Sequence, residues 1–546
     1  MSKLLIVPAV LALALAAAPA FAAAPVKPAA HRAHGGYAVE EKSIAQLQAD
    51  LTAGRVTSEA LVRAYLARIE KLDRNGPKLQ AVLALNPDAL ADARKLDAER
   101  RAGHVRGPLH GIPVLIKDNI ETADPTATTA GSLALKDNVG HRDSPLVARL
   151  RAAGAIILGK TNLSEWANIR SSRSSSGWSA VGGLTRNPYS ADRSACGSSS
   201  GSGAAAASSF AAAAVGTETD GSISCPSAMN GLVGIKPSVG LIPRTFIVPI
   251  SHSQDTPGPM ARSVADAAAM LTVMAGSDAR DPQTADADAH KGDYTQALDP
   301  NALKGKRIGV MRFDAGYDPN VDALLDRAIG DLKAAGAEVV EIKEFKAEND
   351  IGKSEGLVLN TELKADLATY LASAPAAVKS RTLSDLIAFD NAHAHEEMPF
   401  FGQETFEAAD KTKGLDDPDY KKARETSYRL AGSEGIDKML ADDKLDALIA
   451  PTTGPAWTID VVNADHFSGS DTTLPAVAGY PHLTVPMGLI DGLPVGLSFI
   501  GPKWSEARLI GLGYAYEQRT HRRRPPTYAK TSDQLVDVAP SLKPAK

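Results

Sequence analysis

A helix, a glycine turn and a buried strand follow one another in residues 144–163, SPLVARLRAAGAIILGKTNL. Apolar residues recur at helical spacing in its first half, and a short apolar run follows Gly154 in its second. Such alternation of helix and strand is typical of a parallel or mixed sheet with helices packed on it. Strand-like runs also occur at 107–122 and from residue 441 onward. We therefore predict an α/β fold.

The chain contains no internal repeat and no segment with the composition of a linker, so we expect one large domain over residues 39–530. Residues 40–104 have helical periodicity, with Thr57 as a helix N-cap. The alanine-rich run 203–217 predicts a buried helix leading into a strand. Residues 280–440 are more polar and are predicted to be helical. Apolar residues make up 44% of the 546-residue chain, which is enough for a large core.

Both ends of the chain differ from this domain. Residues 1–22 have one basic residue, an apolar core and an Ala-Phe-Ala step, which is the pattern of a secretory signal peptide. The apolar stretch is shorter than the roughly 20 residues that span a bilayer. Residues 23–38 are predicted to be a flexible lead-in and 531–546 a disordered tail. We expect an exported protein, periplasmic or secreted, without a stable membrane anchor after cleavage; the alternative is a retained anchor.

Several classes of function lack their signatures. The formal net charge of −5 gives no basic field for nucleic acid, and the cluster at 521–526 is interpreted as a solvated face. The two histidines of 393–397 are two residues apart and do not share a helix face. There is no HExxH, no paired CxxC and no phosphate-binding glycine loop. We therefore predict neither a metal nor a cofactor.

Two serine-rich segments, CGSSSGSG at 196–203 and GTETDGSISCPSAMNG at 216–231, are candidates for nucleophilic catalysis. A serine nucleophile needs a base, yet neither segment contains a histidine. Residues 197–201 match GxSxG, but the polar residues before them do not form the strand that a nucleophile elbow requires. No SxxK motif occurs in the chain.

Lys117 is a candidate base because it ends the apolar run GIPVLIK. Burial disfavours the charged form and lowers a lysine pKa by up to about 3–5 units, and a neutral lysine can accept a proton. Alternatively, Lys117 extends to the surface or pairs with Asp118.

The only cysteines, Cys196 and Cys225, lie one in each serine-rich segment. Two cysteines do not make a disulfide framework. Either a single bridge joins the segments, or both are buried thiols that pack as small apolar residues.

The chain resembles the amidase signature family in the motifs GIPVLIKDNIET, TTAGS, LGKTNLSEWAN, GSSSGSGAAAA, GTETDGSISCP, GIKPSVGLIPR, SQDTPGPMARSVADAA and GLPVGLSFIG. The resemblance extends from about residue 40 to about residue 525. Within the family the chain is most similar to bacterial secreted peptide amidases. The resemblance implies a single α/β domain, with a mixed, twisted sheet covered by helices on both faces. It also implies an enzyme that uses no metal and no cofactor.

The resemblance also implies a Ser–cis-Ser–Lys triad. The family's lysine corresponds to Lys117, its middle serine, which follows a cis peptide, to Ser198, and its nucleophile to Ser222. Ser199 matches a position that helps to hold the lysine by hydrogen bonding. Glycines at 197 and 201 would permit the unusual backbone.

The family's oxyanion-hole stretch corresponds to the backbone N–H groups of Thr219, Asp220, Gly221 and Ser222. The commoner pattern has a glycine at Asp220 and an arginine at Ser224. One hypothesis is that the Asp220 carboxylate contacts the substrate and disfavours a free C-terminal carboxylate; the alternative is a structural replacement for the lost arginine interaction.

Two further differences concern the first serine segment, where Cys196 and Ser200 replace family glycines. Cysteine adopts positive φ poorly, so the local backbone is an open question. Asn168, in SEWAN, is a candidate for a polar contact with the substrate, or it caps local backbone.

We therefore expect hydrolysis of a carboxylic amide through an acyl-enzyme. The favoured substrate is the C-terminal amide of a peptide, giving the free acid and ammonia; the alternative is a broad acyl or aryl amidase acting on small amides. A relative of the glutamyl-tRNA amidotransferase subunit is disfavoured because that role is cytosolic and needs partner chains. An exported binding protein without activity is a different class of alternative.

Overall fold

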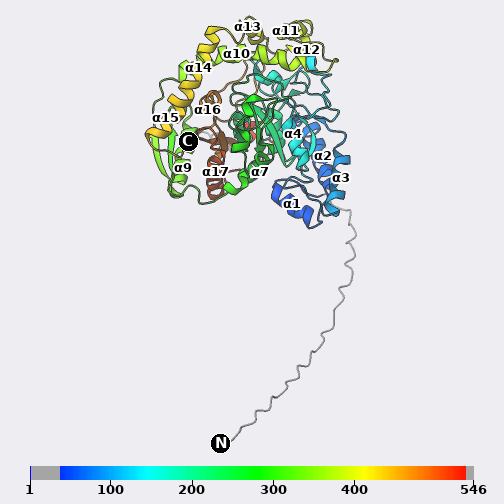
Figure 1. Cartoon of the computed structure of the whole chain (residues 1–546), viewed down its shortest axis with the longest axis vertical. Coiled ribbons are helices and arrows are strands. Elements are labelled where there is room, and N and C mark those ends of the chain that lie inside the picture. The colour runs from blue at the N-terminus through cyan, green and yellow to red at the C-terminus, as the bar shows by residue number, and fades with distance from the viewer. Residues whose placement is uncertain (2–36, 536–546) are drawn as a thin grey trace, which may run out of the picture. The chain divides into compact units, whose positions relative to one another are not determined.

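A mixed sheet of eleven strands forms the centre of the domain, in the order β1-β3-β2-β6-β8-β7-β12-β13-β11-β9-β10. The structure is a computed structural model that describes Met1 and residues 37–535 (Figure 1). The strands are β1 (Val82–Leu85), β2 (Pro113–Lys117), β3 (Ile156–Thr161), β6 (Ala213–Glu218), β7 (Val233–Lys236), β8 (Thr256–Ala261), β9 (Arg307–Met311), β10 (Glu338–Ile342), β11 (Ala447–Pro451), β12 (His482–Ile490) and β13 (Leu493–Ile500), with β4 (Trp178–Ser179) and β5 (Gly183–Leu184) in a separate hairpin.

Helices surround the sheet (Figure 1). The α-helices are α1 (Ile44–Thr52), α2 (Ser58–Ile69), α3 (Ala89–Arg101), α4 (Pro145–Ala152), α5 (Ser200–Ala207), α6 (Ser224–Met229), α7 (Val264–Met274), α8 (Ala287–His290), α9 (Pro319–Ala334), α10 (Glu348–Ala372), α11 (Leu383–Ala392), α12 (Ala394–Glu397), α13 (Glu404–Asp410), α14 (Pro418–Ala431), α15 (Asp437–Asp442), α16 (Thr473–Ala478) and α17 (Glu506–Thr520). The 3₁₀ and π segments are η1 (Glu70–Arg74), η2 (Leu133–Leu135), η3 (Glu165–Asn168), η4 (Pro282–Thr284), η5 (Tyr294–Ala297), η6 (Arg312–Asp314), η7 (Gly432–Ile436) and η8 (Ser532–Leu535).

The predicted α/β class and mixed sheet are confirmed. β2 pairs in parallel with β3 and β6, whereas β6 pairs antiparallel to β8. Helices α5 and α6 pack against each other and on the central strands, while α7, α9 and α17 form a second group on the sheet. The alanine-rich run provides both α5 and β6, and its small side chains let α5 lie close to β2, β6 and β8.

Seven strands were not predicted, namely β1, β4, β5, β7, β8, β9 and β10, and three of them lie in segments that were expected to be helical. β1 lies inside 40–104, which was expected to be helical, and pairs antiparallel to β3 at the sheet edge. β9 and β10 lie inside 280–440 and extend the opposite edge, where β9 pairs in parallel with β11 and β10 pairs in parallel with β9. Both outer strands are partly exposed, and the β10 sequence EVVEI lacks the continuous apolar run of a central strand. The predicted N-cap is confirmed, because the Thr57 hydroxyl accepts a hydrogen bond of 3.1 Å from the Ala60 N–H.

The predicted signal peptide 1–22 and nearly all of the lead-in 23–38 lie outside the described residues. Of the predicted disordered tail, residues 531–535 are folded: η8 lies against the domain, and the Ser532 hydroxyl accepts a 2.8 Å hydrogen bond from Arg193. Among the described residues, no helix is long and apolar enough to cross a membrane.

Candidate active site

Lys117 ends β2 with a fully buried side chain. Its Nζ lies 2.8 Å from Ser198 Oγ, 2.9 Å from Thr217 Oγ1 and 3.3 Å from Thr217 O. It neither extends to the surface nor pairs with Asp118, whose carboxylate lies 3.8 Å from the buried Lys160. Burial lowers the pKa of Lys117 to about 7, against the opposing effect of the Asp255 and Glu218 charges. The lysine is therefore suited to exchange a proton with Ser198 near neutral pH.

The first serine segment turns sharply before α5. The Gly197–Ser198 peptide is cis, as the resemblance implied, and Cys196 adopts a left-handed φ of 56°. A Cβ on Gly197 would clash with the Ser164 hydroxyl, and one on Gly201 with the Ala81 carbonyl. These two glycines have no positive φ, so they are required for close packing and not for the backbone freedom that we predicted.

The second serine segment forms the turn between β6 and α6. Glu218, at the end of β6, accepts hydrogen bonds of 2.8 Å from the N–H groups of Ile223 and Ser224 and of 2.6 Å from the Ser224 hydroxyl. Its carboxylate thus binds the free N–H groups at the start of α6, where negative charge is favourable. Ser222 lies inside this loop and is 8% exposed. The sequence analysis missed Glu218, although an acid placed before a helix start is a detectable signal.

The predicted oxyanion stretch has the backbone that such a site needs. Gly221 adopts φ 78°, a conformation that favours glycine. In the described part of the chain, the N–H groups of Asp220, Gly221 and Ser222 donate no hydrogen bond. The three residues line a cavity, so these N–H groups are available to an incoming oxygen.

Ser199 connects the two segments but does not contact the lysine directly. Its hydroxyl donates to Thr217 O at 3.0 Å and accepts from Thr217 N–H at 3.2 Å, while its own N–H donates to Ser222 O at 3.2 Å. The expected hydrogen-bond support of Lys117 therefore passes through Thr217. Spacing could not identify Thr217, because it contacts a lysine 100 residues away.

A disulfide joins Cys196 to Cys225 and resolves the alternatives left open by the sequence. Their Cα atoms are 6.0 Å apart. One cysteine precedes the cis peptide and the other lies in the first turn of α6, so the bridge links the backbones that carry Ser198 and Ser222.

A cavity of about 280 Å³ opens onto Ser222. Asn168 and Asp220, the two candidate substrate contacts, both line it. Within residues 37–535, the buried Asn168 Oδ1 atom has no hydrogen-bond partner, whereas Asp220 Oδ2 accepts a 2.7 Å hydrogen bond from the Thr473 hydroxyl. Burial raises the pKa of Asp220. Leu359, Trp457 and Phe467 add apolar side chains to its lining.

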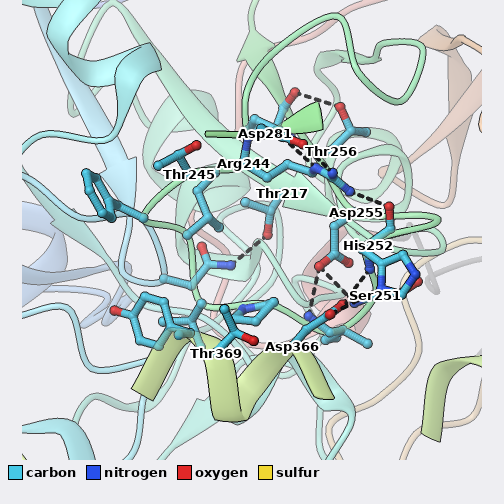
Figure 2. Close-up of a pocket in the computed structure, with 18 of the residues that line it drawn as sticks. Thr217, Arg244, Thr245, Ser251, His252, Asp255, Thr256, Asp281, Asp366 and Thr369 are labelled. Atoms are coloured by element: carbon cyan, nitrogen blue, oxygen red, sulfur yellow. Dashed lines mark hydrogen bonds and ion pairs between the residues drawn. The ribbon is translucent and has the colours of Figure 1, made fainter. Parts of the chain in front are cut away.

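A second cavity of about 470 Å³ adjoins the first, since Ala167, Thr219 and Ile250 line both. Figure 2 shows it between the loop that carries Arg244 to Asp255 and the side chains of Asp366 and Thr369 on α10. Its polar lining includes Asn119 and Thr217, the residue that binds Lys117.

One group among the described residues, His252 with Glu362 and Asp366, has donor atoms close enough for a metal ion. The two ring nitrogens face different carboxylates: Nδ1 lies 3.0 Å from Asp366 and Nε2 3.3 Å from Glu362. Glu362 also accepts hydrogen bonds from the Ser251 and Tyr420 hydroxyls. The hydrogen bond to Asp366 raises the pKa of His252. These contacts therefore connect the loop to α10. We assign no metal to the three residues.

Comparison with known proteins places this arrangement in a family. Residues 60–510 match the family model described as Amidase. A probable amidase of Arabidopsis thaliana is 39% identical over 507 residues, covering 90% of this chain and 92% of that protein. The native peptide amidase of Stenotrophomonas maltophilia is 55% identical, with 90% of this chain and 99% of that chain covered and a TM-score of 0.84. An amidase family protein of Bacillus anthracis is 36% identical, with 90% and 93% covered and a TM-score of 0.82.

The chain is a hydrolase acting on carbon–nitrogen bonds in linear amides. It belongs to the amidase signature family, and the resemblance seen in its motifs is confirmed.

Proposed function

We propose that this protein removes the C-terminal amide of peptides through an acyl-enzyme on Ser222, with Lys117 as the base and Ser198 as the relay between them. The observation that carries the proposal is the 2.8 Å contact between the buried Lys117 Nζ and Ser198 Oγ, with Ser222 on the wall of the adjoining cavity. An identity of 55% to two structures named as peptide amidase supports the substrate class.

The relay needs groups that donate and accept at once, which a hydroxyl does. In the first step Ser222 Oγ bonds to the amide carbon, its proton passes to Ser198, and the Ser198 proton passes to neutral Lys117. The tetrahedral oxyanion accepts hydrogen bonds from the unpartnered N–H groups of Asp220, Gly221 and Ser222. One such donor typically contributes about 2.7–4 kcal/mol to transition-state stabilisation.

Collapse of the intermediate breaks the carbon–nitrogen bond. The proton returns from Lys117 through Ser198 to the leaving nitrogen, and ammonia departs. A water molecule then attacks the acyl carbon by the same relay and releases the peptide acid. In this scheme Ser199 is a supporting residue, since it binds both Thr217 and the Ser222 carbonyl.

The cavity beside Ser222 offers both apolar and polar contacts to a peptide substrate. Its lining includes Trp457 and Phe467, whose rings make an edge contact at 5.6 Å, and the polar side chains of Asn168 and Asp220. An apolar side chain and a backbone amide of a peptide would find partners there. A broad acyl or aryl amidase remains the second candidate, because the same triad serves both substrate classes.

The proposed site of action is outside the cytoplasm, on the basis of the signal-like residues 1–22. The cysteine pair agrees with export, since disulfides persist in oxidising compartments.

Ammonia release from an N-acylated dipeptide amide, measured beside benzamide, tests the proposal. We expect fast release from the peptide amide, loss of that release in Lys117→Ala, and near-normal release in Ser202→Ala, a buried serine of α5 that bonds to Val215 O and not to the lysine. Equal release from both substrates would favour the broad amidase. Undiminished release by Lys117→Ala would refute the triad.

A further inference from the structure

The Asn119 side chain is hydrogen-bonded to Thr217, the residue that binds Lys117. Its Nδ2 donates to Thr217 Oγ1 at 2.9 Å, and Thr217 Oγ1 also lies 2.9 Å from Lys117 Nζ. The backbone of Asn119 is fixed as well, since its carbonyl accepts 2.8 Å from the Val248 N–H. Its side chain is therefore held two residues beyond the lysine and is 3% exposed.

Asn119 and Thr217 also form the boundary between Lys117 and the second cavity. Both line this cavity of about 470 Å³, whereas Lys117 does not and is fully buried. Figure 2 shows the Thr217 hydroxyl with its hydrogen bond inside the group of cavity residues. Asn119 Oδ1 is buried and has no hydrogen-bond partner among the residues that the structure describes. The two side chains thus separate the proposed base from a space large enough to hold water.

The geometry at Lys117 limits how it can act as a base. A neutral lysine has two N–H donors and one lone pair. Thr217 O can only accept, so it takes one donor. The lone pair can face Ser198 only if Thr217 Oγ1 takes the other donor.

We propose that Asn119 is a positioning residue for the reaction: it holds the Thr217 hydroxyl where it accepts from Lys117, and it keeps cavity water away from the lysine. The inference rests on the proposed role of Lys117 as the base, and it assigns to Asn119 a function separate from substrate binding.

Loss of the Asn119 side chain should change the titration of the lysine in a definite direction. The acidic groups whose charges act on Lys117 are Asp255 and Glu218, and both favour its charged form. Asp255 is held by the Thr219 hydroxyl at 2.6 Å. Water entering beside Thr217 would solvate the ammonium form, so the pKa of Lys117 would rise and activity would require a higher pH.

The test is the pH profile of ammonia release by Asn119→Ala and Asn119→Asp, with Thr369→Ala as the matched control. Thr369 lines the same cavity from α10, but its hydroxyl bonds to Ala365 O in its own helix. For Asn119→Ala we expect kcat to fall about tenfold, the rate equivalent of one lost hydrogen bond, with KM within about twofold of the wild type. We also expect the acid limb to move up by about one pH unit.

Asn119→Asp keeps the size of the side chain and can accept the Thr217 hydroxyl proton. Its charge should move the acid limb upward while the high-pH plateau recovers. Thr369→Ala should retain the wild-type profile. A merely structural role would lower the melting temperature of the variants and leave the acid limb in place, and that result would overturn the inference. If Asn119→Ala does not fold, an unmoved acid limb in Asn119→Asp would overturn it equally. Wild-type protein that releases no ammonia would instead refute the proposed function, and this inference with it.

Discussion

Reduction of the Cys196–Cys225 disulfide should destabilise the protein and impair catalysis. The bridge closes a loop with a sequence separation of 29 residues. In the chain-entropy description, a loop of that length contributes about 3.6 kcal/mol to the free energy of unfolding at 25 °C. The loop contains both Ser198 and Ser222, so we expect activity to fall together with stability.

The assay compares oxidised with reduced wild type by equilibrium urea unfolding, followed by fluorescence and circular dichroism. Coincident transitions are required before a free energy is derived. Reduced wild type retains the sulfur atoms that pack with Met229 and Trp457, so the comparison isolates the covalent bond. A Cys196→Ala/Cys225→Ala variant is the control and should not respond to reductant. An unfolding free energy that changes by less than about 1 kcal/mol on reduction, with kcat unchanged, would refute the reasoning.

Three further predictions concern the groups around Ser222. Because burial lowers the pKa of Lys117 to about 7 and only the neutral amine accepts a proton, kcat should fall as pH decreases through about 7; a profile flat to pH 5 would contradict this. Glu218→Gln should reduce the unfolding free energy in urea by about 1.5–3 kcal/mol, because it weakens charge-assisted bonds to the Ile223 and Ser224 N–H groups; an unchanged midpoint would count against it. Asp220→Asn should strengthen inhibition by the peptide acid product, since a carboxylate that faces the cavity is removed; an unchanged inhibition constant would leave Asp220 with a structural role.

The parts of the site that are continuous in sequence could be predicted. Lys117 follows directly on an apolar run, and burial of a strand end is a local property. The fold class was predictable for the same reason, because the helix and strand of 144–163 are adjacent in the chain.

Contacts between distant segments could not be predicted from spacing. Thr217 and Asn119 are 98 residues apart, and only the parallel pairing of β2 with β6 brings them together. The pairing of Cys196 with Cys225 likewise depends on a Cα separation of 6.0 Å that no sequence pattern specifies. Strand β10 was missed because its side chains are only partly buried, so neither alternation nor a continuous apolar run marks it.

Covalent trapping at Ser222 tests the central claim most directly. Purified protein would be treated with a serine-reactive phosphonate and digested with trypsin. Ser198 and Ser222 fall within one tryptic peptide, 194–244, so fragment ions must locate the label. The account predicts a single label on Ser222, its absence in Ser222→Ala, and slow labelling in Lys117→Ala. A label on Ser198 or Ser199 instead, or labelling at the wild-type rate without the lysine, would contradict it.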